Sequence, residues 1–290
     1  MTVNPERVDD IVRRLDELPT LPTVVGRLIE LLDDPKAQAR NIAELIASDA
    51  SLAAKILKLV NSAYFGLPSK ISSVQQAVVI LGFSTIRSIV LGASVIKVFK
   101  QPGVHAGYFS PHAFWNHAVG TGAAAAAIAK IAELPKPEDA FTAGLLHGIG
   151  LLIIDQYLHD VMERVQELVE AEGISLNHAI EHELGFDHAV LAARLLSDWK
   201  LPEHIVIAVQ HHPHVHTCPG DRRLAAAVHF GDLITRVLGY GSAGEPTFPA
   251  VSEEALKDLG FEPTMFPVLI EPIDRAIVNA AIFIDTEVID

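Results

Sequence analysis

The sequence predicts an all-α fold in which a multi-helical N-terminal subdomain packs on a second helical bundle. Apolar residues recur with the period of a helix along almost the whole chain of 290 residues. Strand-like alternation does not persist over a useful length, and proline and glycine fall between the helical segments. Half of the residues are hydrophobic and the mean hydropathy is +0.31, so a substantial core is expected.

The N-terminal subdomain is expected to span residues 1–105. Its helices are predicted, in chain order, at 8–18, 23–33, 41–48, 51–63, 73–82 and 84–99. Ser48 or Asp49 can cap the fourth of these, because both side chains can accept a bond from the first turn. Gly82 is expected to end the fifth helix. The stretch "KQPGVHAGYFS", residues 100–110, is the predicted boundary.

The second bundle is expected to span residues 106–240. Ser110 followed by Pro111 is a strong helix start, and that helix should run to about Glu133. Pro137 opens the next helix, which carries "AFTAGLLHGIGLLIID". Further helices are predicted at 160–172, 176–184, 187–199, 203–212 and 221–238. Residues 241–290 should form a C-terminal extension, with a short helix from Ser252 and a longer one, packed back on the bundle.

Charge and composition exclude several functions. The formal net charge is −14 and no basic run occurs, so binding to nucleic acid is disfavoured. "SVQQAVVILGFSTIRSIV" can be read as a helix–turn–helix, but Arg87 is its only basic residue, which favours core packing. The polar N-terminus and the lack of a long apolar run predict a cytoplasmic protein without a membrane span. Cys218 cannot form an internal disulfide and is interpreted as a surface thiol.

Several of the 14 histidines occupy helix positions from which they can converge. Neutral imidazoles with a carboxylate suit divalent Zn, Fe, Ni or Mn. Each histidine taken alone is more often a hydrogen-bonded structural group, so a buried network without metal is the alternative. The candidate metal ligands are His117, His147, His188, His211, His212 and Asp232.

Several separated motifs occur in order along the chain: "LPTLP", "ASDASLAAKILKLVNSAYFG", "ISSVQQAVVILG" and "FWNHAVGTG…FTAGLLHGIG…LGFDHAVLAARLLSDWKLPEHIVIAVQHH". Together they resemble the HDOD domain, a regulatory relative of the HD phosphohydrolases. The resemblance covers residues 14–240 and implies an HD-like helical bundle around a metal-binding position. His117, His147 and Asp232 would then form one centre, with His188, His211 and His212 as a second cluster.

The departures from the HD pattern bear on activity. Where an active HD enzyme has the aspartate of its His-Asp doublet, this chain has Gly148, and Leu151 replaces a lysine that often follows. Without the carboxylate, two metals and their shared water are not held together. The sequence therefore predicts no catalytic residues at this site and, at most, a mononuclear transition-metal centre.

The leading functional hypothesis is a non-enzymatic signalling module that binds a protein partner or a small signalling molecule, in a cleft between the two helical regions. The alternatives are a metal-dependent phosphohydrolase or phosphodiesterase with a reduced single-metal site, and a transcription regulator. Tyr64 and Phe65, on a predicted loop, either mark a partner surface or fill the seam between the subdomains. We favour the seam.

Overall fold

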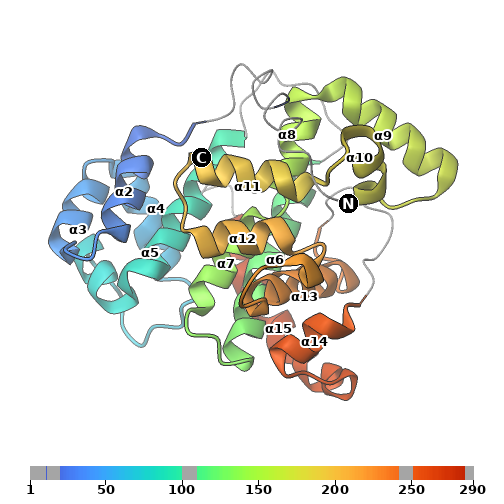
Figure 1. Ribbon diagram of the computed structural model, residues 1–290. Helices are drawn as coiled ribbons and strands as arrows, with labels where there is room; N and C mark the ends of the chain where they lie inside the picture. The colour runs from blue at the N-terminus through green and yellow to red at the C-terminus, as the bar shows by residue number, and fades with distance from the viewer. Residues whose placement is uncertain (1–10, 12–19, 100–109, 242–250, 285–290) are drawn as a thin grey trace.

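The computed structural model describes residues 11, 20–99, 110–241 and 251–284, and across these ranges the regular elements are all helical (Figure 1). The predicted all-α fold is therefore confirmed. The α-helices are α2 (Thr23–Asp33), α3 (Ala39–Ala47), α4 (Ala50–Val60), α5 (Val74–Phe99), α6 (Pro111–Ile131), α7 (Pro137–Leu146), α8 (Ile149–Tyr157), α9 (His159–Glu172), α10 (Leu176–Leu184), α11 (His188–Asp198), α12 (Glu203–His211), α13 (Arg223–Val237), α14 (Glu253–Leu259) and α15 (Phe266–Ala280). Three short 3-10 helices are η1 (Val215–Thr217), η2 (Pro263–Met265) and η3 (Ala281–Phe283).

Helices α2, α3 and α4 pack against α5 on one side of the molecule (Figure 1). Their inward faces supply fully buried aliphatic side chains, including Leu28, Ile46 and Ile56. Asp49 caps α4 by accepting a bond from the backbone of its first turn, as expected. The predicted break at Gly82 is a kink inside α5, where φ is 77° and a residue with a side chain would be strained.

Helix α6 lies at the centre of the second bundle and packs against α7, α13 and α15. Its contact with α7 depends on glycine. A Cβ atom at Gly144 would lie 2.8 Å from the Cα of Gly122, so the two backbones cross too closely for any side chain. This crossing brings the end of α7 beside the polar side chains of α6.

The stretch 140–155 was expected to lie on one helix, but the structure interrupts it. Helix α7 ends at Leu146 and α8 begins at Ile149, with Gly148 at φ −91° and ψ 0° between them. A Cβ atom at Gly150 would collide with the backbone carbonyl of His188, so this glycine lets α8 pack closely on the start of α11. The interruption and this close contact direct His147 and His188 toward the same region.

The C-terminal helices extend the bundle. Helix α15 packs on α6, where a Cβ atom at Gly120 would lie 3.5 Å from the Ile277 side chain of α15 and 2.7 Å from the Thr235 side chain of α13. The predicted helix 8–18 and the boundary segment lie outside the described residues, apart from Ile11 and Ser110. The division at residues 105 and 240 stays a prediction.

Two apolar segments, Val74–Ile96 and Pro137–Tyr157, are long enough to cross a membrane by length and composition. Their apolar windows are 61% and 89% buried inside the fold, which identifies them as core helices. The structure also tests two interpretations of the sequence that depend on the exposure of a single side chain. Arg87 is buried, so it does not offer a DNA-binding surface, and Cys218 is buried rather than a surface thiol.

Candidate metal centre

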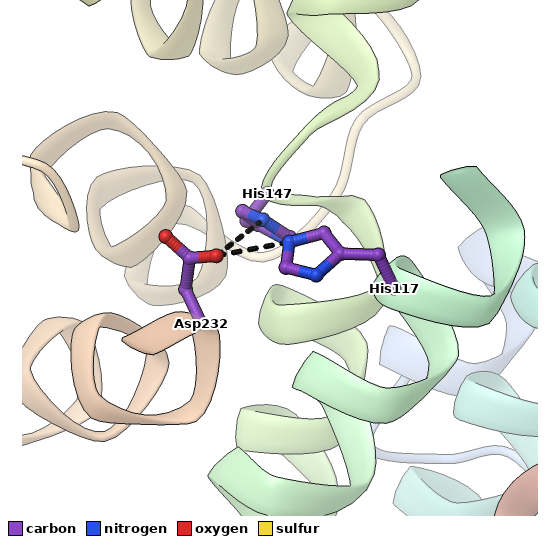
Figure 2. Close-up of side chains that lie close together, drawn as sticks. All are labelled: His117, His147 and Asp232. Atoms are coloured by element: carbon purple, nitrogen blue, oxygen red, sulfur yellow. Dashed lines mark ion pairs between the residues drawn. The ribbon is translucent and has the colours of Figure 1, made fainter. Parts of the chain in front are cut away.

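Three polar side chains meet in the middle of the bundle, and we call them the inner cluster: His117 from α6, His147 from the α7–α8 junction and Asp232 from α13. Nε2 of His117 lies 2.9 Å from Oδ1 of Asp232, and Nε2 of His147 lies 3.7 Å from the same oxygen (Figure 2). One ligand atom from each residue lies within 4.8 Å of the others. The three residues are at most 5% exposed, so the cluster is closed to bulk solvent.

The hydrogen bond that His147 makes with the backbone fixes its tautomer. Nδ1 lies 2.6 Å from the carbonyl oxygen of Gly144, and because a carbonyl only accepts, Nδ1 carries the proton. Burial lowers the pKa of His147 to about 3, against the attraction of Asp232, so the ring is neutral at pH 7. Its Nε2 lone pair therefore faces the Asp232 carboxylate. This is the arrangement of metal-binding histidines, whose second nitrogen donates to a carbonyl or carboxylate.

His117 gives the clearest test of whether a metal fits. Both of its ring nitrogens are buried, and neither makes a hydrogen bond with acceptable geometry, although Nε2 lies close to Asp232. A buried nitrogen without a hydrogen bond is costly. A cation between the two Nε2 atoms and Oδ1 would satisfy Nε2 of His117, though not its Nδ1, and would relieve the contact between the His147 lone pair and the carboxylate. The donor set of two imidazoles and one carboxylate suits Fe(II), Zn, Ni or Mn.

Arg236, one helical turn after Asp232, competes for the same carboxylate. Its Nε donates to Oδ1 at 2.7 Å and its second terminal nitrogen donates to Oδ2 at 3.0 Å. Burial alone would raise the pKa of Asp232, but Arg236 and the neighbouring imidazoles hold it well below its usual range. Asp232 is therefore a buried carboxylate anion. The four-residue spacing of this pair could have revealed Arg236 in the sequence, where it was missed.

His188 and His212 continue from the inner cluster as a row of rings packed edge to face. The rings of His147 and His212 lie 5.1 Å apart, and those of His212 and His188 lie 5.6 Å apart. Nδ1 of His212 donates to the Val209 carbonyl, and Nδ1 of His188 lies 2.6 Å from Oδ1 of Asn177. Burial lowers the pKa of His212 to about 3 and that of His188 well below its usual value. Both rings are therefore neutral near pH 7.

His211 does not join this row, although it was expected to cluster with His188 and His212. It is half-buried, its Nδ1 lies 2.8 Å from Oγ1 of Thr217, and it lines a separate cavity on the outside of the bundle. Consecutive residues at the end of α12 point their side chains in different directions, which separates His211 from His212. The same outer region holds Glu181, Asp187 and His214, which sequence reasoning did not single out.

A cavity of about 840 Å³ lies where the N-terminal helices meet the bundle, and we call it the seam cavity. Its wall is mainly apolar, with contributions from α5, α6, α7 and α15 and from the loop after α4. The ring of Tyr64 lies 5.6 Å from those of both Phe141 and Phe283, so this loop packs against α7 and η3, and Tyr64 and Phe65 also line the cavity. Lys130 and Glu138 are the charged side chains in the lining.

The described chain is an all-helical bundle that buries a cluster of two histidines and an aspartate. The chain belongs to the HDOD family, because the HDOD domain pattern matches residues 18–215. It is similar to an HDOD domain protein of Geobacter sulfurreducens, with 26% identity, a TM-score of 0.77 and 96% of each chain covered. A proposed phosphohydrolase of Shewanella amazonensis SB2B is 25% identical, with a TM-score of 0.75 over 96% of this chain and 97% of that one.

Other relatives are similar over part of their length. A proposed signal transduction protein of Marinobacter aquaeolei VT8 shares the fold, with 22% identity and a TM-score of 0.72 over 97% of this chain and 64% of that one. An uncharacterized protein of Treponema pallidum is 26% identical over 231 residues, which are 79% of this chain and 44% of that protein. This chain thus spans less than half the length of that curated relative.

Proposed function

We propose that the protein is a non-enzymatic, cytoplasmic regulatory module of the HDOD family that binds a protein partner or a small signal in the seam cavity. The inner cluster would hold one transition metal in a structural role, and binding at the seam would carry the signal. The division between the two helical regions is part of this proposal.

The observation that carries the proposal is Gly148. It follows His147 at the position where HD enzymes have an aspartate, and it offers no ligand atom. A Cβ atom there would meet the Phe114 ring at 3.3 Å, so an aromatic side chain borders the space that a carboxylate would enter. The inner cluster is also at most 5% exposed, so a phosphoester would have no open route to His147, which supports the non-enzymatic assignment.

The seam cavity supports the binding part of the proposal. Its volume of about 840 Å³ lies within the range of small-molecule sites, and its wall combines aromatic rings with a few polar groups. Elements from both helical regions line it, so an occupant would contact both at once. A ligand that binds one arrangement of the two regions more tightly would shift the population toward that arrangement.

A single-metal phosphohydrolase is the second candidate. The donor set of His117, His147 and Asp232 favours it, as does the similarity to the proposed Shewanella phosphohydrolase. The two candidates differ in one outcome, which is turnover of a phosphoester that depends on the inner cluster.

The test is a hydrolysis assay with Mn²⁺, Fe²⁺ or Ni²⁺ and a panel of nucleotides, cyclic dinucleotides and bis-p-nitrophenyl phosphate. We expect no turnover above that of the metal alone. Turnover that disappears in His147→Ala, but persists in a variant of an exposed histidine such as His178→Ala, would refute the non-enzymatic assignment. Binding of the same panel, measured by thermal shift, separates a nucleotide signal from a protein partner.

A further inference from the structure

A second set of metal-ligating side chains lies on the outside of the bundle, and we call it the outer group: Glu181 from α10, Asp187 before α11 and His214 between α12 and η1. Nε2 of His214 lies 3.0 Å from Oε1 of Glu181 and 3.7 Å from Oδ2 of Asp187. One ligand atom from each residue lies within 4.8 Å of the others. The three residues are far apart in sequence, so the tertiary fold brings these donors together.

The negative charges of the outer group favour the binding of a cation. Two carboxylates converge on one imidazole nitrogen, and a single Nε2–H can donate a full hydrogen bond to only one of them. Asp187 is 7% exposed, so water screens its charge poorly, and its other oxygen accepts a bond from the Val190 backbone. A divalent ion between the three donor atoms would neutralise both carboxylates at once.

The surroundings of the outer group allow an ion to enter and leave. A cavity of about 280 Å³ is lined by all three residues and also by His211 and His216. The side chain of His214 is 46% exposed, so the site is open to solvent, unlike the inner cluster. The two additional imidazoles on the wall offer further nitrogen donors, and water can complete the coordination shell.

We propose that the outer group binds a divalent first-row transition metal, such as Zn²⁺, through Glu181, Asp187 and His214. Two short backbone connections link this site to the buried rings. Asp187 directly precedes His188, and His214 follows His212 by two residues. A metal ion bound to the outer group would therefore restrain the backbone that carries the buried rings of His188 and His212. This inference is independent of the proposed function, because it concerns a different set of ligands.

The test counts Zn²⁺ ions bound by the full chain, after chelation, by calorimetric titration and native mass spectrometry. We expect His214→Ala and Glu181→Gln each to lose one equivalent relative to the unaltered chain, whatever the occupancy of the inner cluster. Asp187→Asn should weaken this equivalent at least about tenfold because it removes the charge, and it should keep the fold because asparagine caps a helix as well as aspartate does. His178→Ala, an exposed histidine on α10, is the matched control and should keep the full count.

Two results would overturn the proposal. One is an unchanged zinc count and affinity in His214→Ala and Glu181→Gln. The other is loss of the ion only in His211→Ala or His216→Ala, which would assign it to a different ligand set. Glu181→Gln changes one half-exposed side chain, so it keeps the test valid if another variant fails to fold. Zinc should also raise the melting temperature of the unaltered chain more than that of Asp187→Asn.

Discussion

The inner cluster and the seam cavity have opposite physical properties. The inner cluster has the side chains for metal chemistry, a fixed histidine tautomer and a buried anion, but it is at most 5% exposed. The seam cavity has about 840 Å³ of space and an apolar wall, but it lacks a comparable set of ligands. The metal-binding side chains are therefore buried, and the space for a ligand lies elsewhere.

Under the proposed function, this difference explains how an HDOD bundle can serve regulation. An enzyme needs its metal and its substrate in one place, whereas a regulatory module needs only a binding site whose occupancy changes the relation between two parts. In this chain Gly148 separates the two requirements, because it removes a ligand from the inner cluster and leaves the bundle intact. The predictions below test each side of the comparison.

The largest expected effect is the pH dependence of the free energy of unfolding, measured on protein from which metal ions have been removed with a chelator. Burial lowers the folded-state pKa values of His147 and His212 to about 3 and that of His188 well below its usual value. The unfolded chain therefore takes up protons that the folded chain does not. The free energy of unfolding should be at its full value above pH 6.5 and should fall as the pH drops toward 3. Each histidine contributes about 1.4 kcal/mol per pH unit, so the three together contribute about 4 kcal/mol per pH unit.

Urea unfolding at several pH values between 7.5 and 5 measures this slope. His212→Gln should reduce the slope by one proton, since glutamine does not titrate, whereas the exposed His178→Ala should leave it unchanged. An identical slope in His212→Gln and the unaltered chain would show that the buried row is protonated in the folded state, contrary to the geometry.

The next effect concerns the missing carboxylate. Gly148→Asp should tighten the binding of Mn²⁺ or Zn²⁺ to the inner cluster by about tenfold or more, which is about 1.4 kcal/mol. Gly148 has φ −91°, so a side chain is tolerated there, although Phe114 must shift slightly. Gly148→Asn is the matched control, because it has the same size without the charge. Equal metal affinity in the two variants would show that a carboxylate at this position does not reach the metal.

The smallest effect concerns the seam cavity. Ala127→Trp, on the cavity wall, should fill the space and change the free energy of unfolding by less than about 1 kcal/mol. It should abolish binding of the fluorescent apolar probe 1-anilinonaphthalene-8-sulfonate to the native protein. Ala171→Trp, an exposed position on α9, adds the same ring elsewhere and should not affect the probe. Undiminished probe fluorescence in Ala127→Trp would argue against a ligand site at the seam.

The sequence predicted most of the fold because its signals are local. Apolar periodicity, capping residues such as Asp49 and Ser110, and glycine stops located the helices to within a few residues in most of the described chain. Meeting points between distant helices have no such signal. His117, His147 and Asp232 are separated by 30 and 85 residues, and they were connected through the resemblance to HD proteins.

What the sequence could not reveal depends on side-chain direction. His211 and His212 are neighbours in the chain, yet one lines an outer cavity and the other joins the buried row. Glu181 and Asp187 look like an ordinary helix residue and a helix cap, and only the tertiary structure places them beside His214. The volume of the seam cavity likewise depends on how four helices and a loop pack together, which periodicity does not determine.

The central claim is that the inner cluster can still bind a metal, although Gly148 replaces the aspartate that HD enzymes have after the histidine. The most direct test is anomalous scattering from crystals of protein expressed with excess transition metal. The account predicts one strong peak bounded by Nε2 of His117, Nε2 of His147 and the Asp232 carboxylate, which is absent in Asp232→Asn. A metal content at this position below about a tenth of an equivalent would contradict it, because a folded site whose donor atoms converge is expected to bind an available ion.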